Sequence, residues 1–305
     1  MNRIVFFGSG PVAAKSLELL AQDFEIEAVI TKPKPTHHRG EFPVISVAEI
    51  LGLKILTVTS RRELDDLFAT KPVTSELGVV IDFGLIISQE VIDYFPLGIV
   101  NSHFSLLPEW RGADPITFSI LSGQEQTGIS LMLITAGLDE GPLLAQAPYA
   151  VPVDTTTPEL TEELVDLSHK ALVQILPIYM NGTIMPAPQE QVTIAGSKEP
   201  SFSRKLTKED GIIDWNKPAE QLEREIRAFI EWPKSSTKLG SVPVIITKAV
   251  VTKMPEQPKP GELSIEKSRL LVGTGQDWLE IISLKPEGKK EMPIQAFLAG
   301  YRSRL

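Results

Sequence analysis

The sequence predicts an α/β protein in two parts: a Rossmann-like, mostly parallel sheet in residues 1–184 and a smaller, OB-like β-barrel in residues 204–305. Helix and strand signals alternate through the first part, which is typical of a parallel sheet with helices on both faces. Several short β-like runs with few helices make up the second part. Residues 185–203 are polar and contain prolines, as expected of a linker.

The first strand, turn and helix are predicted at the start of the chain. Residues 3–7 are β-branched and aromatic, residues 8–11 read Gly-Ser-Gly-Pro, and residues 12–21 have a helical pattern. The turn superficially fits the Gly-x-Gly-x-x-Ala fingerprint of dinucleotide-binding proteins. No acidic residue follows the next strand, residues 26–31, where a ribose would need one. We therefore interpret the turn as a tight connection in a parallel α/β domain.

The remaining elements follow in the same alternating order. Further strands are expected at residues 54–58, 77–82, 98–101, 128–134 and 143–147, with helices at 46–51, 61–69, 88–94, 115–121 and 158–180. In the second part a helix is expected at 218–229, strands at 242–252, 261–263, 269–272 and 279–284, and a last helix at 294–298.

Composition excludes several classes of site. The chain of 305 residues is 42% hydrophobic and 23% charged, which is typical of a soluble globular protein with a real core. We expect no signal segment and no membrane helix, because no apolar run approaches about twenty residues. The chain has no cysteine, which excludes disulfides and thiolate sites and is compatible with a cytoplasmic location. Two adjacent histidines in the basic loop of residues 32–40 lack a third ligand, so we expect no metal.

Charge divides unevenly along the chain. The net charge is −9, yet residues 197–305 carry 19 Lys and Arg against 15 Asp and Glu, whereas residues 1–196 carry 11 against 24. The C-terminal part is therefore the candidate for binding a polyanion. A mild excess of this kind is also found on surfaces that are merely solvated.

The clearest candidate site is the stretch Asn-Ser-His-Phe-Ser-Leu-Leu-Pro at residues 101–108. An apolar run leads directly into Asn101 and His103, so both side chains lie at the end of a buried strand and, being two apart, point the same way. Ligands of open α/β sheets bind at such strand ends. From spacing alone, both side chains could equally satisfy buried backbone groups. A serine hydrolase is excluded, because neither Ser102 nor Ser105 lies in a Gly-x-Ser-x-Gly turn.

This stretch, with the Trp-Arg-Gly of residues 110–112 and the Gly-Leu-Asp-Glu-Gly of residues 137–141, resembles the signature of the formyltetrahydrofolate-dependent formyltransferases. The resemblance implies that Asn101, His103 and Asp139 are catalytic. It implies 10-formyltetrahydrofolate as co-substrate, without a metal. The folate-binding residues that it implies are Phe83, Gly84, Leu85, Ile86, Ser105, Leu106, Leu107 and Pro108. Asp82 departs from the family, which has a small residue at that position.

The C-terminal part resembles the C-terminal domain of methionyl-tRNA formyltransferases. The similarity lies in the Lys-Leu-Thr-Lys-Glu-Asp-Gly-Ile-Ile-Asp-Trp entry at residues 205–215, in residues 226–233 and in residues 284–290. The implied partner is methionyl initiator tRNA, and we expect a cytoplasmic, monomeric enzyme of translation initiation. The basic residues that we expect to contact the tRNA are Arg39, Lys205, Arg224 and Arg227, although each could be a solvated surface charge.

Two other functions fit parts of the same pattern. An amino-sugar nucleotide formyltransferase shares the catalytic domain and can carry a small barrel, but the basic C-terminal part favours tRNA. A binding module without catalysis would not need the complete set of Asn101, His103 and Asp139.

Overall fold

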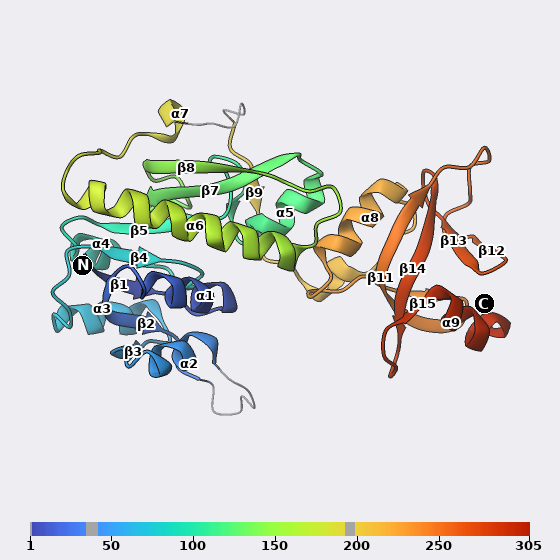
Figure 1. Cartoon of the computed structure of the whole chain (residues 1–305), viewed down its shortest axis with the longest axis horizontal. Coiled ribbons are helices and arrows are strands. Elements are labelled where there is room, and N and C mark those ends of the chain that lie inside the picture. The colour runs from blue at the N-terminus through green and yellow to red at the C-terminus, as the bar shows by residue number, and fades with distance from the viewer. Residues whose placement is uncertain (1, 35–41, 193–198) are drawn as a thin grey trace. The chain divides into compact units, whose positions relative to one another are not determined.

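The computed structural model describes residues 2–34, 42–192 and 199–305, and its contacts divide the chain into two compact units (Figure 1). The first unit comprises Met1–Pro115, Gln126–Ala150 and Thr161–Ser203. The second comprises Ile116–Glu125, Val151–Leu160 and Arg204–Leu305.

The first unit is built on a seven-stranded sheet with the order β3-β2-β1-β4-β5-β7-β8. Five of these strands are parallel, and β7 and β8 pair antiparallel to β5 and to each other, which confirms the prediction of a mostly parallel, Rossmann-like sheet. In Figure 1 the strands follow in this order from the blue to the green part of the ribbon. Their bounds are β1 Arg3–Phe7, β2 Glu25–Thr31, β3 Ile55–Thr57, β4 Gly78–Val80, β5 Ile99–His103, β7 Gln126–Leu133 and β8 Leu143–Ala150.

Helices between the strands cover the sheet. Their bounds are α1 Pro11–Leu20, α2 Pro43–Ile50, α3 Arg61–Ala69, α4 Gln89–Asp93 and α6 Thr157–Met180, most of which belongs to this unit; α5 Pro115–Ser122 falls almost entirely in the second unit. Val5 and Phe7 of β1 pack in the core cluster that contains Leu64 and Phe68 of α3. Side chains alternate along a strand, so the fully buried Ile4 and Phe6 face the other side. Both faces of the sheet are therefore buried, as the apolar strand sequences predict.

The segment predicted as a linker contains regular structure of its own. The short helix α7 (Gln189–Val192) follows Ala187, which bridges to Leu143 of β8. Strand β9 (Phe202–Ser203) pairs in parallel with β6 (Arg111–Gly112) in a separate two-stranded sheet. The polar composition of residues 185–203 concealed these elements, because none of them is long enough to show a period.

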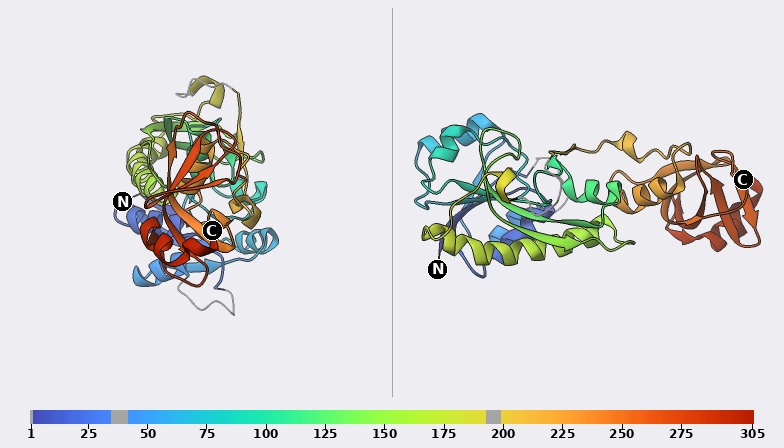
Figure 2. Two further views of the ribbon diagram at one scale, coloured as in Figure 1. Left: turned by 90° about the vertical axis from the view of Figure 1, so that its right-hand side faces the viewer. Right: turned by 90° about the horizontal axis from the view of Figure 1, so that it is seen from above.

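The second unit contains one antiparallel sheet with the order β10-β11-β14-β13-β12, with β15 pairing to β14. It comprises the short helix η1 Lys208–Gly211, helix α8 Ala219–Ala228, strands β10 Ser236–Leu239, β11 Val242–Thr252, β12 Leu263–Glu266, β13 Arg269–Gly273, β14 Trp278–Pro286 and β15 Met292–Pro293, and helices α9 Ile294–Tyr301 and η2 Arg302–Arg304. Leu222 and Ile226 of α8 pack against the sheet in one apolar core. The sheet curls (Figure 2), consistent with the predicted small barrel.

Several details of this unit differ from the prediction, which also did not include the short elements η1, β15 and η2. Strand β10 was not expected, because a four-residue run with one large apolar side chain has no detectable alternation. The third strand starts at Leu263 and follows Gly261, which has a φ of +80° and belongs to the turn. Pro218, expected inside the helix, precedes it with extended backbone angles.

Candidate functional site

Asn101 and His103 lie at the end of β5, in the middle of the first sheet. Asn101 pairs with Val80 of β4 and with Met132 of β7, so strands flank it on both sides. His103 is the last residue of the strand, and only 7% of its side chain is exposed.

Asp139 reaches both of these side chains from the loop between β7 and β8. Its Oδ1 lies 3.5 Å from Asn101 Nδ2, and its Oδ2 lies 3.8 Å from His103 Nδ1. The backbone N–H of Gly112 donates a hydrogen bond of 2.8 Å to the same Oδ2. The structure therefore brings together the three residues that the sequence predicts as catalytic, although they are up to 38 positions apart.

The hydrogen bonds of His103 select one tautomer of its ring. His103 Nε2 lies 2.9 Å from the carbonyl oxygen of Trp110. A carbonyl oxygen can only accept, so Nε2 carries the hydrogen, and in the neutral ring Nδ1 has the free lone pair. Nδ1 faces the Asp139 carboxylate, which would stabilise the ring after it takes up a proton.

Strained backbone is concentrated around these residues. Among the described non-glycine residues, eight have positive φ, and four of them are Asp82, Trp110, Asp114 and Asp139, with φ between +47° and +59°. Residues other than glycine rarely adopt this backbone conformation. It persists where the surrounding structure enforces it, often at functional sites.

Two further residues, Gln189 and Arg111, hold the loops together, and the sequence singled out only Arg111, as part of a motif. Gln189 of α7 donates from Nε2 to the carbonyl oxygens of Asp139 and Gly141, at 2.8 and 3.0 Å. Its Oε1 accepts from an Arg111 guanidinium nitrogen at 2.7 Å. Arg111 belongs to the recognised Trp-Arg-Gly motif, but Gln189 lies in the polar linker and carries no motif signal.

The first predicted folate-binding loop, residues 83–86, combines one buried and three more accessible residues. Phe83 is 3% exposed and packs in the core, whereas Ile86 is 73% exposed. The Lys32 ammonium donates to the carbonyl oxygen of Gly84 at 2.9 Å and holds the loop to the end of β2. Gly84 has a φ of +65°, which favours glycine. The Phe83 side chain therefore anchors the loop to the core, while Gly84, Leu85 and Ile86 remain more accessible.

The second predicted loop, residues 105–108, is buried. Ser105, Leu106 and Leu107 are each at most 1% exposed, and Pro108 is buried too. The hydroxyl of Ser130 donates to Ser105 O at 2.7 Å and accepts from Leu107 N–H at 2.9 Å. These side chains thus shape the loop from the core.

The glycine turn is closed by backbone hydrogen bonds. The N–H groups of Ser9 and Gly10 donate to the carbonyl oxygen of Asp82, at 2.9 and 3.4 Å, and Gly8 N–H donates to Ile30 O. These donors are not directed at a phosphate, which agrees with the interpretation of the turn as a connection.

Asp82 fills the space beside this turn. A side chain on Gly10 would collide with the Asp82 carboxylate, whose Oδ2 lies 1.8 Å from the position of a Cβ. Part of Asp82 is exposed, but its carboxyl lies among protein atoms, and this burial, with the nearby Asp114 charge, raises its pKa to about 6. Lys32 opposes the shift.

The residues that we expect to contact tRNA differ in their exposure and in the partners of their charged groups. Arg39 lies outside the described residues. Lys205 is exposed. Arg224 is half-buried, and its Nε donates to Leu121 O at 3.1 Å. Arg227 forms a two-point ion pair with Glu223 at 2.6 and 3.0 Å and donates to Thr155 O at 2.7 Å.

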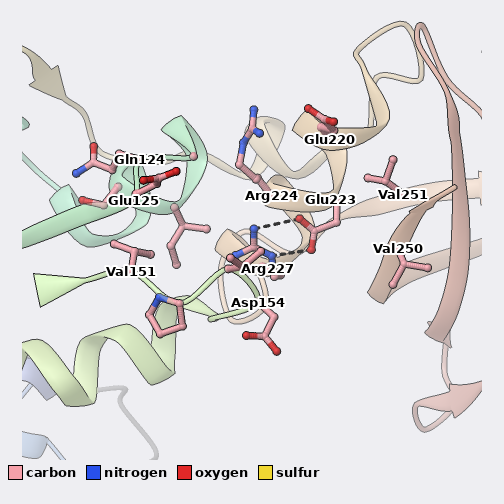
Figure 3. A pocket seen from close by; sticks show the side chains of 15 residues that line it. Gln124, Glu125, Val151, Asp154, Glu220, Glu223, Arg224, Arg227, Val250 and Val251 are labelled. Atoms are coloured by element: carbon pink, nitrogen blue, oxygen red, sulfur yellow. Dashed lines mark hydrogen bonds and ion pairs between the residues drawn. The ribbon is translucent and has the colours of Figure 1, made fainter. Parts of the chain in front are cut away.

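A pocket of about 420 Å³ lies in the second unit, around Arg224 and Arg227 (Figure 3). Its lining includes four carboxylates, those of Glu125, Asp154, Glu220 and Glu223. Acidic groups thus outnumber basic ones, which makes the pocket unsuitable for a phosphate. None of the three predicted catalytic residues lines it.

Two kinds of feature are absent from the ranges that the structure describes. No helix there is long and apolar enough to span a membrane. No group of three or more His, Cys, Asp and Glu residues in those ranges is arranged to hold a metal ion.

Comparison with family models matches both parts of the chain. Residues 2–176 match the model described as formyl transferase, and residues 205–302 match that of the formyl transferase C-terminal domain. The methionyl-tRNA formyltransferase of Roseiflexus sp. (strain RS-1) is 36% identical over 310 residues, covering 98% of this chain and 93% of the relative. That of Pseudoalteromonas translucida (strain TAC 125) is 35% identical over 306 residues, covering 98% and 94%.

Solved structures share the fold at lower identity. An N-formyltransferase from Helicobacter canadensis, in complex with folinic acid and dTDP-3-aminofucose, superposes with a TM-score of 0.67 at 16% identity, covering 96% of this chain and all of that one. HypX from Aquifex aeolicus with tetrahydrofolic acid gives a TM-score of 0.63 at 17% identity, covering 98% of this chain and 47% of that chain.

Proposed function

This chain belongs to the formyl transferase family, and on that premise we propose that it transfers the formyl group of 10-formyltetrahydrofolate to the amino group of methionyl initiator tRNA. The observation that carries the proposal is the similarity to methionyl-tRNA formyltransferases along 98% of the chain, including the C-terminal part. The product would serve translation initiation.

The residues around the candidate site fit a folate. Ile86 and Leu138 are large apolar side chains with 73% and 62% exposure, on the two loops that carry Gly84 and Asp139. Exposed apolar groups beside convergent polar ones are typical of a site for a flat, partly apolar ligand. Gly84, Leu85 and Ile86 would contact the folate, with Phe83, Ser105, Leu106, Leu107 and Pro108 holding the loops in shape. The folate supplies the formyl carbonyl group.

Asn101, His103 and Asp139 supply the groups that formyl transfer needs. Attack of an amine on a carbonyl carbon places negative charge on the carbonyl oxygen, and the uncharged amide of Asn101 can donate a hydrogen bond to it. His103 Nδ1, with its lone pair, can accept the proton that the amine loses and return it to the folate nitrogen as the bond from that nitrogen to the formyl carbon breaks. Asp139 can stabilise the resulting imidazolium from 3.8 Å.

We propose that the C-terminal unit binds tRNA through Lys205, Arg224 and Arg227, and that Arg39, in the N-terminal part of the chain, adds a further basic contact. Lys205 is the strongest of the described candidates, because its charge is exposed. The Trp232 indole donates to Leu206 O and is 55% exposed, so an aromatic surface that could stack on a base lies beside Lys205. Arg227 is compensated by Glu223, so its part would be to shape this unit.

We also propose that the protein acts as a monomer in the cytoplasm, where its acceptor takes part in translation. Light scattering on the purified chain, with and without tRNA, tests the oligomeric state.

The test of function is a formylation assay with 10-formyltetrahydrofolate in which methionyl initiator tRNA and an amino-sugar nucleotide are offered side by side. Chromatography then identifies the formylated product. We expect formyl-methionine on the initiator tRNA alone. Formylated sugar would assign the protein to the sugar-modifying branch, and no product with either acceptor would favour a binding module.

A further inference from the structure

Gln189 is a buried glutamine of the first unit, in the segment between α6 and β9. It is 3% exposed, and it is the only buried residue of the four in α7. We propose that Gln189 is a positioning residue that holds Asp139 in its active orientation. The inference rests on the proposed formyl transfer at Asn101, His103 and Asp139. A polar side chain buried this deeply is destabilising unless it is hydrogen-bonded, so its partners indicate its role.

The contacts of Gln189 define the orientation of its amide. Nε2 donates to the carbonyl oxygens of Asp139 and Gly141, at 2.8 and 3.0 Å. Oε1 accepts from Arg111 at 2.7 Å. A reversed amide would place its oxygen against two carbonyl oxygens and its nitrogen against a guanidinium, so only this orientation satisfies all three partners. The side chain of Gln189 therefore joins the loop that carries Asp139 and Gly141 to Arg111 of β6.

Asp139 depends on such support. Its φ is +49°, a conformation that persists only when neighbouring groups enforce it. Its carboxylate also has to stay 2.8 Å from Gly112 N and 3.8 Å from His103 Nδ1. The hydrogen bond from Gln189 Nε2 holds the carbonyl group of Asp139 itself. The hydrogen bond from the Arg111 guanidinium to Gln189 Oε1 holds Arg111, which directly precedes Gly112.

Arg111 makes this dependence stronger. Its Nε is buried and has no hydrogen-bond partner in the described structure, and the Glu140 carboxylate lies 3.7 Å from its Nη1. The Gln189 oxygen, at 2.7 Å, is thus closer to this guanidinium than the Glu140 carboxylate is. Loss of Gln189 would leave a mostly buried cation poorly satisfied and loosen strand β6, which contains Arg111 and Gly112.

The test compares Gln189→Met and Gln189→Glu with the same substitutions at Gln191. Met removes all three hydrogen bonds at similar volume, and Glu keeps the acceptor for Arg111 but loses both donors. Gln191 lies on the same short helix with its side chain exposed, which makes it a matched control. Steady-state kinetics, thermal unfolding and amide hydrogen exchange are measured on the full chain.

We expect both Gln189 variants to lower kcat at least about 10-fold, because small misplacement of a reacting group is costly, with the KM for folate within about two-fold of the original protein. The N–H of Gly112 and the amides of residues 137–141 should exchange faster in the Gln189 variants. The Gln191 variants should change neither kcat nor exchange.

Several results would overturn the proposal. These are an unchanged kcat in Gln189→Met, unchanged exchange at Gly112 and residues 137–141, or a loss of activity that accompanies a general loss of folding seen in the thermal midpoint of both variants. Failure of the proposed function would look different, because the original protein itself would then not formylate methionyl-tRNA. Hydrogen exchange would still decide whether Gln189 positions Asp139.

Discussion

The backbone N–H of Gly112 and the side chain of Asp139 are joined by a hydrogen bond of 2.8 Å to Oδ2. Gly112 has a φ of +106°, and a Cβ at this position would lie 2.5 Å from the carbonyl oxygen of Ser203. Only glycine can present its N–H in this way. The identity of residue 112 is therefore linked to the position of the carboxylate between Asn101 and His103.

Substituting Gly112 should affect both stability and rate. Gly112→Ala is expected to destabilise the protein by about 1–3 kcal/mol, because the backbone must leave its left-handed conformation and the Ser203 carbonyl must move. The same movement would displace the donor to Asp139 and lower kcat. Urea unfolding and formylation kinetics measure the two effects. Gly182→Ala is a suitable control, since its φ is also positive, at +75°, but its Cβ would have no neighbour within 4 Å. Equal effects at both glycines would contradict the account.

Replacing the carboxylate of Asp139 by an amide should slow the reaction with little change in folding. Asp139→Asn removes the charge that would stabilise protonated His103, and we expect kcat to fall at least about 100-fold. Single-turnover formylation measures the change. Asp166→Asn changes an exposed carboxylate on α6 in the same way and should leave the rate unaltered. A rate within a few-fold of the original would remove Asp139 from the mechanism.

Asp82 should make stability depend on pH. Its pKa is raised to about 6 in the folded state, so folded protein binds this proton more tightly than unfolded protein does, and stability falls as pH rises from about 4 to 6. The Asn side chain of Asp82→Asn does not ionise, so this fall in stability with rising pH should disappear. Asn also tolerates the φ of +47°.

The Asp82→Asn variant should be more stable by about 1 kcal/mol at pH 7.5, allowing for solvent screening of a partly exposed group. The gain should disappear below about pH 4. Urea unfolding at a series of pH values, with Asp166→Asn as the control, tests this. A gain that stayed constant with pH would show that the charge of Asp82 is not its cause.

Lys205 and Arg227 should respond differently to loss of charge. Arg227→Met leaves Glu223 and Thr155 O without their partner, and we expect about 2 kcal/mol of destabilisation.

Lys205 lies on the surface, so Lys205→Met should change stability by less than about 0.5 kcal/mol. It should weaken tRNA binding and reduce the slope of log affinity against log salt by about 1. Filter binding at several salt concentrations measures the slope. An unchanged slope would remove Lys205 from the RNA contact.

The sequence was sufficient to predict features that repeat or that sit in a motif. The alternation of apolar runs predicted the parallel sheet, because each buried strand is a separate apolar segment. Asn101 and His103 could be placed at a strand end, since the apolar run stops there. Asp139 required the resemblance, because nothing local indicates that its loop folds back to β5.

Other parts of the site leave no local signal. The Trp110 carbonyl and the Gly112 N–H are backbone groups that any sequence possesses. Gln189 lies in a polar segment, where its burial depends on two loops distant in sequence. Phe83 and Leu107 belong to recognised motifs, yet their side chains pack in the core. A motif match does not distinguish a residue that contacts a ligand from one that supports the loop.

The most direct test of the account is the single-turnover rate of formyl transfer from 10-formyltetrahydrofolate to methionyl initiator tRNA by the original protein and by Asn101→Ala. Removal of the donor to the carbonyl oxygen should lower the rate by about 10²–10³-fold, with folate affinity within a few-fold. Asn181→Ala, on the surface after α6, serves as the control. Unchanged transfer by Asn101→Ala would contradict the assignment of this site as the place where the formyl group moves.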